Sequence, residues 1–297
     1  MNWFKSNGWV PALAAMLVSV CWGANFTASR FAMEHFPPFF TVLLRFVLVC
    51  VLLLPFVLRH RMPPWRDALV ISFLYITMHF ALIFFAMAQG LNITSAIVAS
   101  QMGVPFSCVL AAIFFRDFLG PWRSFGLLVS FAGLLVISGT PNVDAHWGAF
   151  LIATLGALAW AGANIYMKRM KPQPVVSMLF WPGLFALPQM LLLSGLFETP
   201  SLTLISSAPL SAWAGIFYSA LFSSIVGYGL WMWLLGRYSM TQVVPYSLLV
   251  PVVGIGCGVL IFAEPLTPLI LSGAALVVTG VAIITIRRPK LAELEKL

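Results

Sequence analysis

Ten long apolar runs limit what this chain of 297 residues can fold into more than any other feature. Each run has about 20 residues, the length that a helix needs to cross the hydrocarbon core of a bilayer. The runs lie at about 10–30, 38–58, 67–88, 93–115, 122–139, 147–167, 175–196, 211–234, 241–263 and 266–286. Because backbone polar groups in lipid must be hydrogen-bonded within their own segment, these runs predict an all-α membrane protein with ten transmembrane helices.

Composition agrees with a membrane protein. Hydrophobic residues make up 61% of the chain and charged residues 8%, whereas soluble domains carry about a quarter charged residues. The net charge of +8 comes from basic residues scattered through short loops, so it predicts no nucleic acid partner. The first run has full spanning length, and we expect it to be retained rather than removed as a signal peptide. Four cysteines lie inside apolar runs without a CxxC pattern and indicate neither disulfides nor a metal site: Cys21, Cys50, Cys108 and Cys257.

The basic residues also predict the orientation of the chain. Of the 16 lysines and arginines, 14 fall on the cytoplasmic side if the N-terminus is cytoplasmic, Arg30 lies near an outer loop, and Arg45 lies within the second helix. Short cytoplasmic loops of membrane proteins carry such an excess of positive charge. We therefore expect both termini to be cytoplasmic.

The chain repeats itself. The segment ANFTASR (24–30) aligns with ANIYMKR (163–169), and later pairs keep the same order at a spacing of 139 to 147 residues. Five helices per repeat is an odd number, so the second copy must enter the membrane from the opposite side. Inverted repeats are typical of secondary transporters, although a duplicated scaffold without transport remains an alternative. The predicted units are a first five-helix repeat over 10–139, a second, inverted repeat over 147–286 and a cytoplasmic tail over 287–297.

Several motifs resemble the EamA family of the drug/metabolite transporter superfamily. They are the paired Trp-x-Ala-Asn and Trp-Ala-x-x-Asn segments, Leu44-Arg45-Phe46, Val226-Gly227-Tyr228-Gly229 and Leu235-Gly236-Arg237-Tyr238. The resemblance covers residues 10–286, and the stretch 226–254 is most similar to bacterial exporters of amino acids and their metabolites. It implies a ten-helix exporter of the bacterial inner membrane, with a central cavity between helices 1, 3, 4, 6, 8 and 9.

One motif departs from the family pattern. Members often carry Gly-Glu-Arg-Leu after helices 4 and 9, where this chain has RDFL (116–119) and AEPL (263–266). The acidic residue is kept and the following base is lost, so the resemblance implies no ion pair there.

Polar side chains inside spans usually face the interior of a helix bundle or a cavity. Helical spacing puts Ser72, Tyr75 and His79 on one stripe of the third helix. His79 is interpreted either as a ligand or proton-linked group or as a partner in a helix–helix hydrogen bond. Some tryptophans are interfacial anchors instead. The predicted cavity residues are Trp22, Asn25, Tyr75, His79, Gln101, Trp160, Asn164, Tyr228, Trp231 and Tyr246.

Two prolines interrupt predicted helices near their middle. Pro105 and Pro251 lack an N–H donor, which leaves the carbonyls of Gln101 and Ser247 without their helical partner. Such free carbonyls favour a wet cavity lining, and the alternative is a simple packing kink. Arg45 in the second helix could bind a carboxylate, although such an arginine more often caps carbonyls or extends toward the interface.

The two asparagines of the repeat lie on opposite sides of the bilayer centre. Asn25 lies about 7 Å beyond the midpoint of the first helix toward the outer face, and Asn164 about 10 Å beyond that of the sixth toward the cytoplasm. They are interpreted as equivalent groups at the two ends of one pathway, or else as structural caps.

Together these features predict a secondary transporter that exports amino acids or related small metabolites by alternating access. A multidrug or lipophilic-cation exporter is the alternative, and the lack of an intramembrane carboxylate disfavours it. The sequence has no GxxxxGK[ST], HExxH or GxSxG motif, so we expect neither an enzyme nor a bound cofactor or metal. The expected partners are the lipid bilayer and a small-molecule substrate, with the protein a monomer or weak homodimer.

Overall fold

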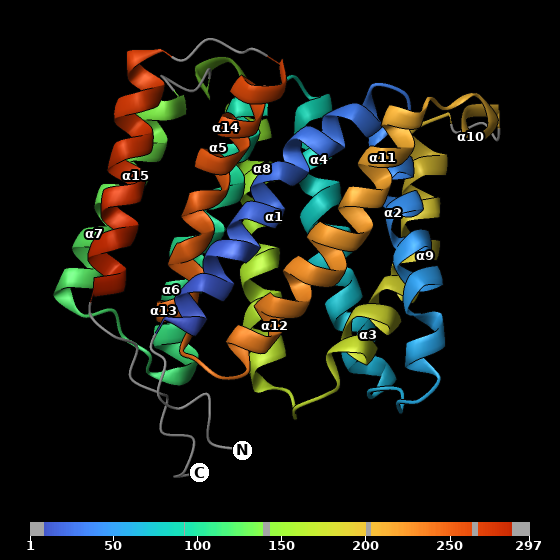
Figure 1. Ribbon diagram of the computed structural model, residues 1–297, viewed down its shortest axis with the longest axis horizontal. Helices are drawn as coiled ribbons and strands as arrows, with labels where there is room; N and C mark the ends of the chain where they lie inside the picture. The colour runs from blue at the N-terminus through green and yellow to red at the C-terminus, as the bar shows by residue number, and fades with distance from the viewer. Residues whose placement is uncertain (1–8, 92, 139–142, 200–202, 263–266, 287–297) are drawn as a thin grey trace.

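The computed structural model describes residues 9–91, 93–138, 143–199, 203–262 and 267–286 (Figure 1). Within these ranges the regular secondary structure is entirely helical. The segments are α1 (Val10–Met33), α2 (Pro38–Val57), α3 (Trp65–Ile71), η2 (Ser72–Met78), α4 (His79–Ala88), α5 (Ile93–Gln101), α6 (Gly103–Phe115), α7 (Pro121–Ser138), α8 (Val143–Arg169), α9 (Val175–Phe197), α10 (Thr203–Ser207), α11 (Leu210–Tyr218), η3 (Ser219–Tyr228), α12 (Gly229–Leu235), α13 (Met240–Val243), η4 (Val244–Leu249), α14 (Val250–Phe262) and α15 (Pro268–Ile286).

Each of the ten apolar runs contains helix, as expected, and the chain is a multi-pass membrane protein. Seven helical stretches in the described residues are long and apolar enough to cross a bilayer. Three shorter apolar helices lie at 99–115, 121–137 and 268–284. The number of ten membrane crossings therefore remains a prediction. The short helix α10, between the seventh and eighth runs, is an element that the apolar pattern did not predict.

Proline marks where several of these helices begin. Pro38, Pro121 and Pro268 are the first residues of α2, α7 and α15. A proline costs little at this position because the first N–H groups of a helix have no intrahelical acceptor. The sequence thus sets the helix starts at the membrane surface, where the apolar runs begin.

The third and eighth runs each contain a π-helical segment between two α-helical ones. These segments, η2 and η3, begin at Ser72 and Ser219, which are 219 − 72 = 147 residues apart. That spacing lies within the range of the sequence repeat. The π-helix is rare and is frequently found at functional sites. Both halves of the molecule therefore carry the same irregularity at matching positions.

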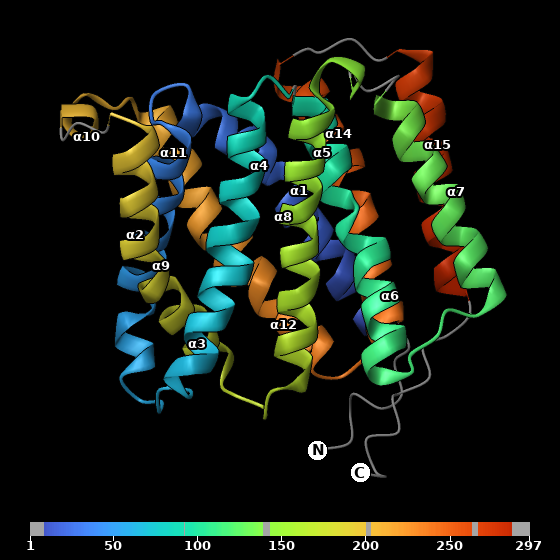
Figure 2. The same ribbon diagram turned by 180° about the vertical axis from the view of Figure 1, so that it is seen from behind.

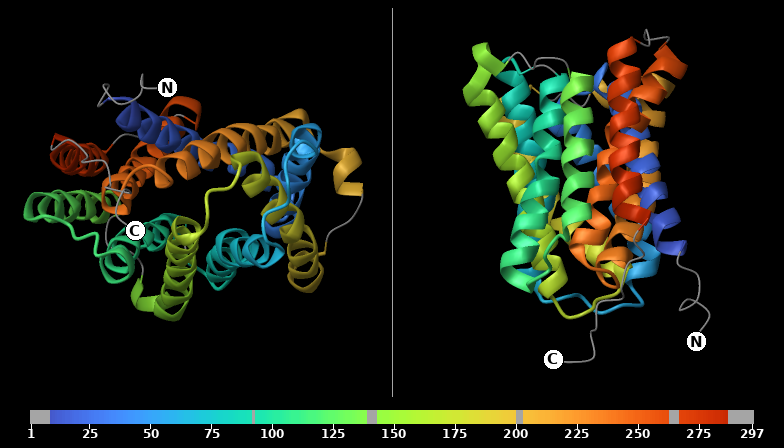
Figure 3. Two further views of the ribbon diagram at one scale, coloured as in Figure 1. Left: turned by 90° about the horizontal axis from the view of Figure 1, so that it is seen from below. Right: turned by 90° about the vertical axis from the view of Figure 1, so that its left-hand side faces the viewer.

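The helices pair in a way that is repeated between the two halves. Helix α1 packs against α11, η3 and α14, and α8 packs in the same manner against α4, η2 and α6. Figures 1 and 2 show α1 and α8 crossing the middle of the bundle in opposite directions. Two further pairs, α2 with α9 and α7 with α15, lie on opposite sides of the bundle in Figure 3.

Small residues let the α7–α15 pair approach closely. A Cβ atom added to Gly133 would lie 2.6 Å from the carbonyl oxygen of Gly273, so no larger side chain fits. The Oγ of Ser130 donates a hydrogen bond of 3.2 Å to the Val277 carbonyl. The backbones of α7 and α15 therefore approach closely at these residues.

The loops that carry the basic residues lie at one end of the bundle. Figure 1 places the connections from α2 to α3, α6 to α7, α8 to α9 and α12 to α13 at the lower end. Helix α1 begins and α15 ends at this same end. We call it the basic end.

Candidate functional site

Aromatic side chains from both halves meet where α1 and α8 cross the bundle. The ring centroid of Trp22 lies 5.0 Å from that of Tyr228 and 5.0 Å from that of Trp231. Trp160 lies 5.6 Å from Trp231, and Tyr75 lies 4.7 Å from Tyr228. We call these five residues the aromatic cluster. The structure thus brings together half of the predicted cavity residues.

A glycine makes room for this cluster. A Cβ atom at Gly227 would lie 2.7 Å from Nε1 of Trp22, closer than side chains tolerate. The same Nε1–H donates a hydrogen bond of 3.2 Å to the Ser223 carbonyl. The glycine in the VGYG motif therefore lets the indole of Trp22 lie directly on η3.

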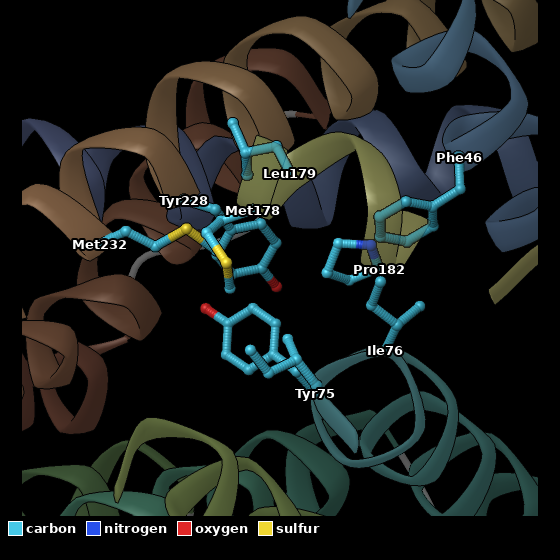
Figure 4. A pocket seen from close by; sticks show the side chains of 9 residues that line it. Phe46, Tyr75, Ile76, Met178, Leu179, Pro182, Tyr228 and Met232 are labelled. Carbon is cyan, nitrogen blue, oxygen red and sulfur yellow. The ribbon is translucent and has the colours of Figure 1, made fainter. Parts of the chain in front are cut away.

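A small cavity adjoins the cluster. It has a volume of about 20 Å³, which holds about one water molecule and excludes an amino acid. Figure 4 shows the side chains of Tyr75 and Tyr228 at its centre. The Tyr75 hydroxyl is buried and has no hydrogen-bond partner among the described residues. The lining residues are Phe46, Ile71, Tyr75, Ile76, Met178, Leu179, Pro182, Tyr228 and Met232.

This cavity lies between other helices than the resemblance implied. Its lining comes from α2, α3, η2, α9, η3 and α12, which form the second, third, seventh and eighth runs. Helices 1, 4, 6 and 9 were also expected to contribute, and none of them lines this cavity. The aromatic side chains of helices 1 and 6 fill the bundle centre instead, because Trp22 and Trp160 pack against Trp231.

Arg45 is buried beside the cavity. Its side chain is 4% exposed, Nε donates a hydrogen bond of 2.7 Å to Oγ of Ser224, and Nη2 donates one of 3.0 Å to Oγ of Ser223. No described carboxylate forms an ion pair with it. Three aromatic rings lie 5.6 to 5.9 Å from Cζ, namely those of Phe46, Phe80 and Tyr228.

The two asparagines of the repeat differ in their surroundings. Asn164 is completely buried, and its Oδ1 accepts a hydrogen bond of 2.9 Å from Nε1 of Trp231. Asn25 is half-buried, and its Nδ2 donates a bond of 3.2 Å to Oγ of Ser29 on the same helix. Each amide keeps one buried atom without a partner, Oδ1 in Asn25 and Nδ2 in Asn164.

His79 lies away from the cavity lining. Its Nδ1 lies 3.1 Å from the carbonyl oxygen of Gly156 on α8, which requires a proton on Nδ1. The predicted stripe assumed α-helical spacing, but the π-helix η2 precedes His79 and changes the angular position of every later side chain. Tyr75 therefore faces the cavity while His79 faces α8. The contact is the helix–helix hydrogen bond that the sequence left as an alternative.

The fourth run is interrupted one turn before Pro105. Helix α5 ends at Gln101, a turn at Met102 follows, and Pro105 is the third residue of α6. The Gln101 side chain is 7% exposed. Next to it, a Cβ atom at Gly103 would lie 2.8 Å from the Trp160 ring, so this break packs against the aromatic cluster.

The ninth run changes helix type before Pro251. Tyr246 lies in the 3-10 helix η4, is 7% exposed, and accepts a hydrogen bond of 2.8 Å at its carbonyl from Oγ of Ser19. The carbonyl of Ser247 accepts the N–H of Val250. The prediction that Pro251 leaves this carbonyl unpaired is therefore wrong, because the tighter 3-10 turn supplies a donor three residues on.

Polar contacts hold the basic end of α8. The Tyr166 hydroxyl donates a hydrogen bond of 2.6 Å to Oδ1 of Asp67. Nζ of Lys168 donates two bonds of 2.7 Å, to the carbonyls of Leu235 and Tyr238. These contacts tie α8 to α3 and to the end of α12. Positive charge is favourable there, because the last carbonyls of a helix lack intrahelical donors.

Two carboxylates cap helix starts at the two ends of the bundle. Asp117 accepts hydrogen bonds from the backbone N–H and the Oγ1 of Thr241, at the start of α13. Glu198 accepts the N–H groups of Phe39 and Phe40, at the start of α2. The acidic residue of the RDFL segment therefore serves as a cap, which satisfies donors that the helix itself leaves open.

Sequence reasoning missed the apolar part of the cavity. Phe46, Met178, Pro182 and Met232 line it, yet nothing distinguishes them from the many apolar residues that face lipid. The sequence did mark Arg45 as a candidate functional residue, since a charged residue inside a membrane-spanning segment is costly and rare. Its neighbours Ser223 and Ser224 become significant only once α2 and η3 are placed side by side.

The chain matches known transporters over most of its length. A model of the EamA-like transporter family matches twice, over residues 9–139 and 146–286. A Salmonella typhimurium protein named a probable amino-acid metabolite efflux pump is 34% identical over 280 residues, covering 91% of this chain and 92% of that protein. An Escherichia coli protein of the same name is 32% identical with the same coverage. The uncharacterized inner membrane transporter YedA of Escherichia coli is 26% identical and covers 93% of this chain and 91% of its own.

The fold is also shared with a solved structure. A crystal structure superposes with a TM-score of 0.81 at 17% sequence identity, covering 94% of this chain and 97% of that chain. At this identity the similarity concerns the fold alone.

Proposed function

Since the chain belongs to the EamA-like transporter family, we propose that it exports amino acids or related small metabolites across the bacterial inner membrane by alternating access. Family and relatives indicate a membrane transporter rather than an enzyme. Two relatives are named probable amino-acid metabolite efflux pumps and a third an inner membrane transporter, and these names support the proposed substrate class and membrane.

The topology belongs to the same proposal. The chain crosses the membrane ten times as two inverted five-helix repeats, with the basic end and both termini in the cytoplasm. The opposite directions of α1 and α8 support the inversion. The gathering of the basic loops at one end supports the orientation, because short cytoplasmic loops are rich in lysine and arginine.

The aromatic cluster is the observation that carries the proposed transport function. Its residues come from α1 and η2 of the first half and from α8, η3 and α12 of the second. In transporters built from inverted repeats, substrate binds near the midplane between the repeats. A cluster that joins the two halves at this depth is where a substrate would be held, with Asn25 and Asn164 on either side along the pathway.

The size of the cavity supports the proposal of alternating access. At about 20 Å³ it cannot hold an amino acid, so substrate enters only after the two halves move apart. At the basic end, the hydrogen bond from Tyr166 to Asp67 joins the two halves, so such a movement must break it.

The lipophilic-cation alternative fits the site less well. Buried carboxylates are the usual counter-charge for a cation inside a membrane protein, and the described cavity lining has none. Arg45 places a positive charge beside the cavity, which repels a cationic substrate.

Transport by purified protein tests the proposal. Proteoliposomes loaded with labelled amino acids should release them faster than liposomes without protein, for at least one member of the panel. A Trp231→Ala variant should lose this flux, and a variant of the exposed Trp122 at the start of α7, Trp122→Ala, should keep it. Release at the rate of empty liposomes for the whole panel would refute amino-acid export, and resistance to toxic cations on expression would then favour the alternative.

A further inference from the structure

Arg45 carries a positive charge that no described residue neutralises. It is the eighth of the 20 residues of α2, which places its Cα about 4 Å from the middle of that helix. A charge at this depth is costly, and intramembrane arginines normally pair with an acidic group or face an aqueous path. Here the described partners are two serine hydroxyls and three ring faces.

These contacts orient the guanidinium without balancing its charge. Serine Oγ atoms accept from Nε and Nη2, so they hold the plane of the group from the side of η3. Arginine has five N–H donors, and these two bonds use two of them. Aromatic faces stabilise a cation by a modest amount compared with the cost of burying it. The arrangement is that of a cation prepared for an anionic ligand.

The cation also lies beside the cavity. Phe46 and Tyr228 line the cavity, and their rings lie 5.6 Å and 5.9 Å from Cζ of Arg45. The tyrosine pair at the cavity centre includes the buried hydroxyl of Tyr75, which interacts with Trp160 and Tyr228 but forms no hydrogen bond of good geometry with any described residue. A fixed cation and unpaired hydroxyl next to one cavity are the groups that a carboxylate needs, because a guanidinium binds both carboxylate oxygens at once.

We propose that Arg45 binds the carboxylate of the transported substrate, so that the protein selects metabolites bearing a carboxylate. This inference rests on the proposed transport function and narrows its substrate class. Ser223 and Ser224 act as positioning residues that hold the guanidinium toward the cavity, and the Tyr75 hydroxyl donates to the bound carboxylate once the cavity opens. The substrate supplies the counter-charge that the described residues lack.

The first experiment needs no variant. Proteoliposomes are loaded with each labelled amino acid or with its primary amide, which has the same side chain but no carboxylate. The expected result is flux of the acid and at least about 10-fold slower flux of the amide, the factor that a lost hydrogen bond to a charged group gives. Equal flux of acid and amide would overturn the role of Arg45 while leaving amino-acid export intact.

Variants then locate the effect. Arg45→Gln should lower kcat/KM for the acid by about 10- to 100-fold and remove the preference for acid over amide. Arg45→Lys keeps the charge but not the paired donors, so its kcat/KM for the acid should lie between those of Arg45→Gln and the wild type. Arg59→Gln, an exposed arginine in the loop after α2, is the matched control and should behave as wild type. Unchanged acid preference in Arg45→Gln would contradict the proposal.

A binding measurement separates this proposal from the transport function. Amino acids should raise the Tm of the detergent-purified wild-type protein, whereas their amides should not, and Arg45→Gln should lose the effect. If wild type moves no compound yet shows this Arg45-dependent stabilisation, export is wrong and the carboxylate site stands. If it shows neither flux nor stabilisation, both are wrong. Should Arg45→Gln fail to fold, the comparison of acid with amide on wild type decides.

Discussion

Asn25 and Asn164 occupy matching positions in the two halves of the chain, yet they differ in burial and in their hydrogen-bond partners. Asn164 is completely buried and bound to the Trp231 indole. Asn25 is half-buried and bound only to Ser29, one turn along its own helix. The two asparagines therefore have different environments, and Asn164 is the more deeply buried of the two.

The difference extends beyond the two asparagines. Asn164 is followed on α8 by Tyr166 and Lys168, which bind α3 and the end of α12. Asn25 is followed on α1 by Ser29, which binds back to Asn25 itself. Tyr166 and Lys168 thus bond to other segments, whereas Ser29 bonds within its own helix. Matching stretches of the two repeats therefore make different side-chain hydrogen bonds.

The largest effect is expected at Lys168. Lys168→Met keeps a long apolar side chain but removes both hydrogen bonds to the carbonyls of Leu235 and Tyr238. Hydrogen bonds from a charged group contribute about 1.5 to 3 kcal/mol, so we expect the free energy of unfolding to fall by about 2 kcal/mol. Unfolding in a mixed-detergent titration measures this. Lys171→Met, at an exposed lysine in the next loop, is the control, and an equal loss there would show that the basic end is not held by Lys168.

The asparagines themselves give a smaller effect. Asn164→Leu leaves the buried indole N–H of Trp231 without its acceptor, and interhelical hydrogen bonds in membrane proteins contribute about 1 kcal/mol. Asn25→Leu removes only a bond within one helix, and we expect a loss below about 0.5 kcal/mol. The two variants are compared in the same unfolding titration. Equal losses in the free energy of unfolding would mean that Asn25 and Asn164 are packed alike, which would contradict the difference described above.

Tyr166 should give an effect smaller than that of Asn164. Tyr166→Phe removes one hydroxyl that is bonded to Asp67 at the half-exposed end of the bundle, and such pairs contribute about 0.6 kcal/mol on average. Because this contact must break when the basic end opens, the initial rate of amino-acid release should rise slightly as stability falls. Tyr238→Phe serves as the control. A rise in stability, or an unchanged rate of amino-acid release, would show that the Tyr166 hydroxyl plays no part in the opening movement.

Sequence alone predicts much of this fold because the bilayer imposes it. The apolar runs had to become helices, since lipid offers no partners for the backbone, and each run contains helix. Polar and aromatic residues inside the runs also indicated which side chains meet in the bundle, because Tyr75 does contact Tyr228 and Trp160 does contact Trp231. Their rarity in an apolar segment is what made them visible.

Other features left no trace in the sequence pattern. The π-helices η2 and η3 break the 3.6-residue period, so the position of His79 could not follow from spacing. The lining by Met178 and Met232 depends on which apolar face meets another helix and which meets lipid, and both faces have the same composition. The Ser247 carbonyl is hydrogen-bonded because the turn there is 3-10, in which a carbonyl accepts from the residue three positions on. In an α-helix the donor would be one position further along the chain.

The small volume of the cavity has a consequence for every affinity that will be measured on this protein. Under the proposed alternating access, a molecule whose pocket holds about one water molecule would bind substrate only during the fraction of time that it spends open. The observed dissociation constant is the intrinsic one divided by that fraction. Substitutions that loosen the basic end should therefore strengthen apparent binding without touching the substrate, and weak binding would measure how rarely the bundle opens.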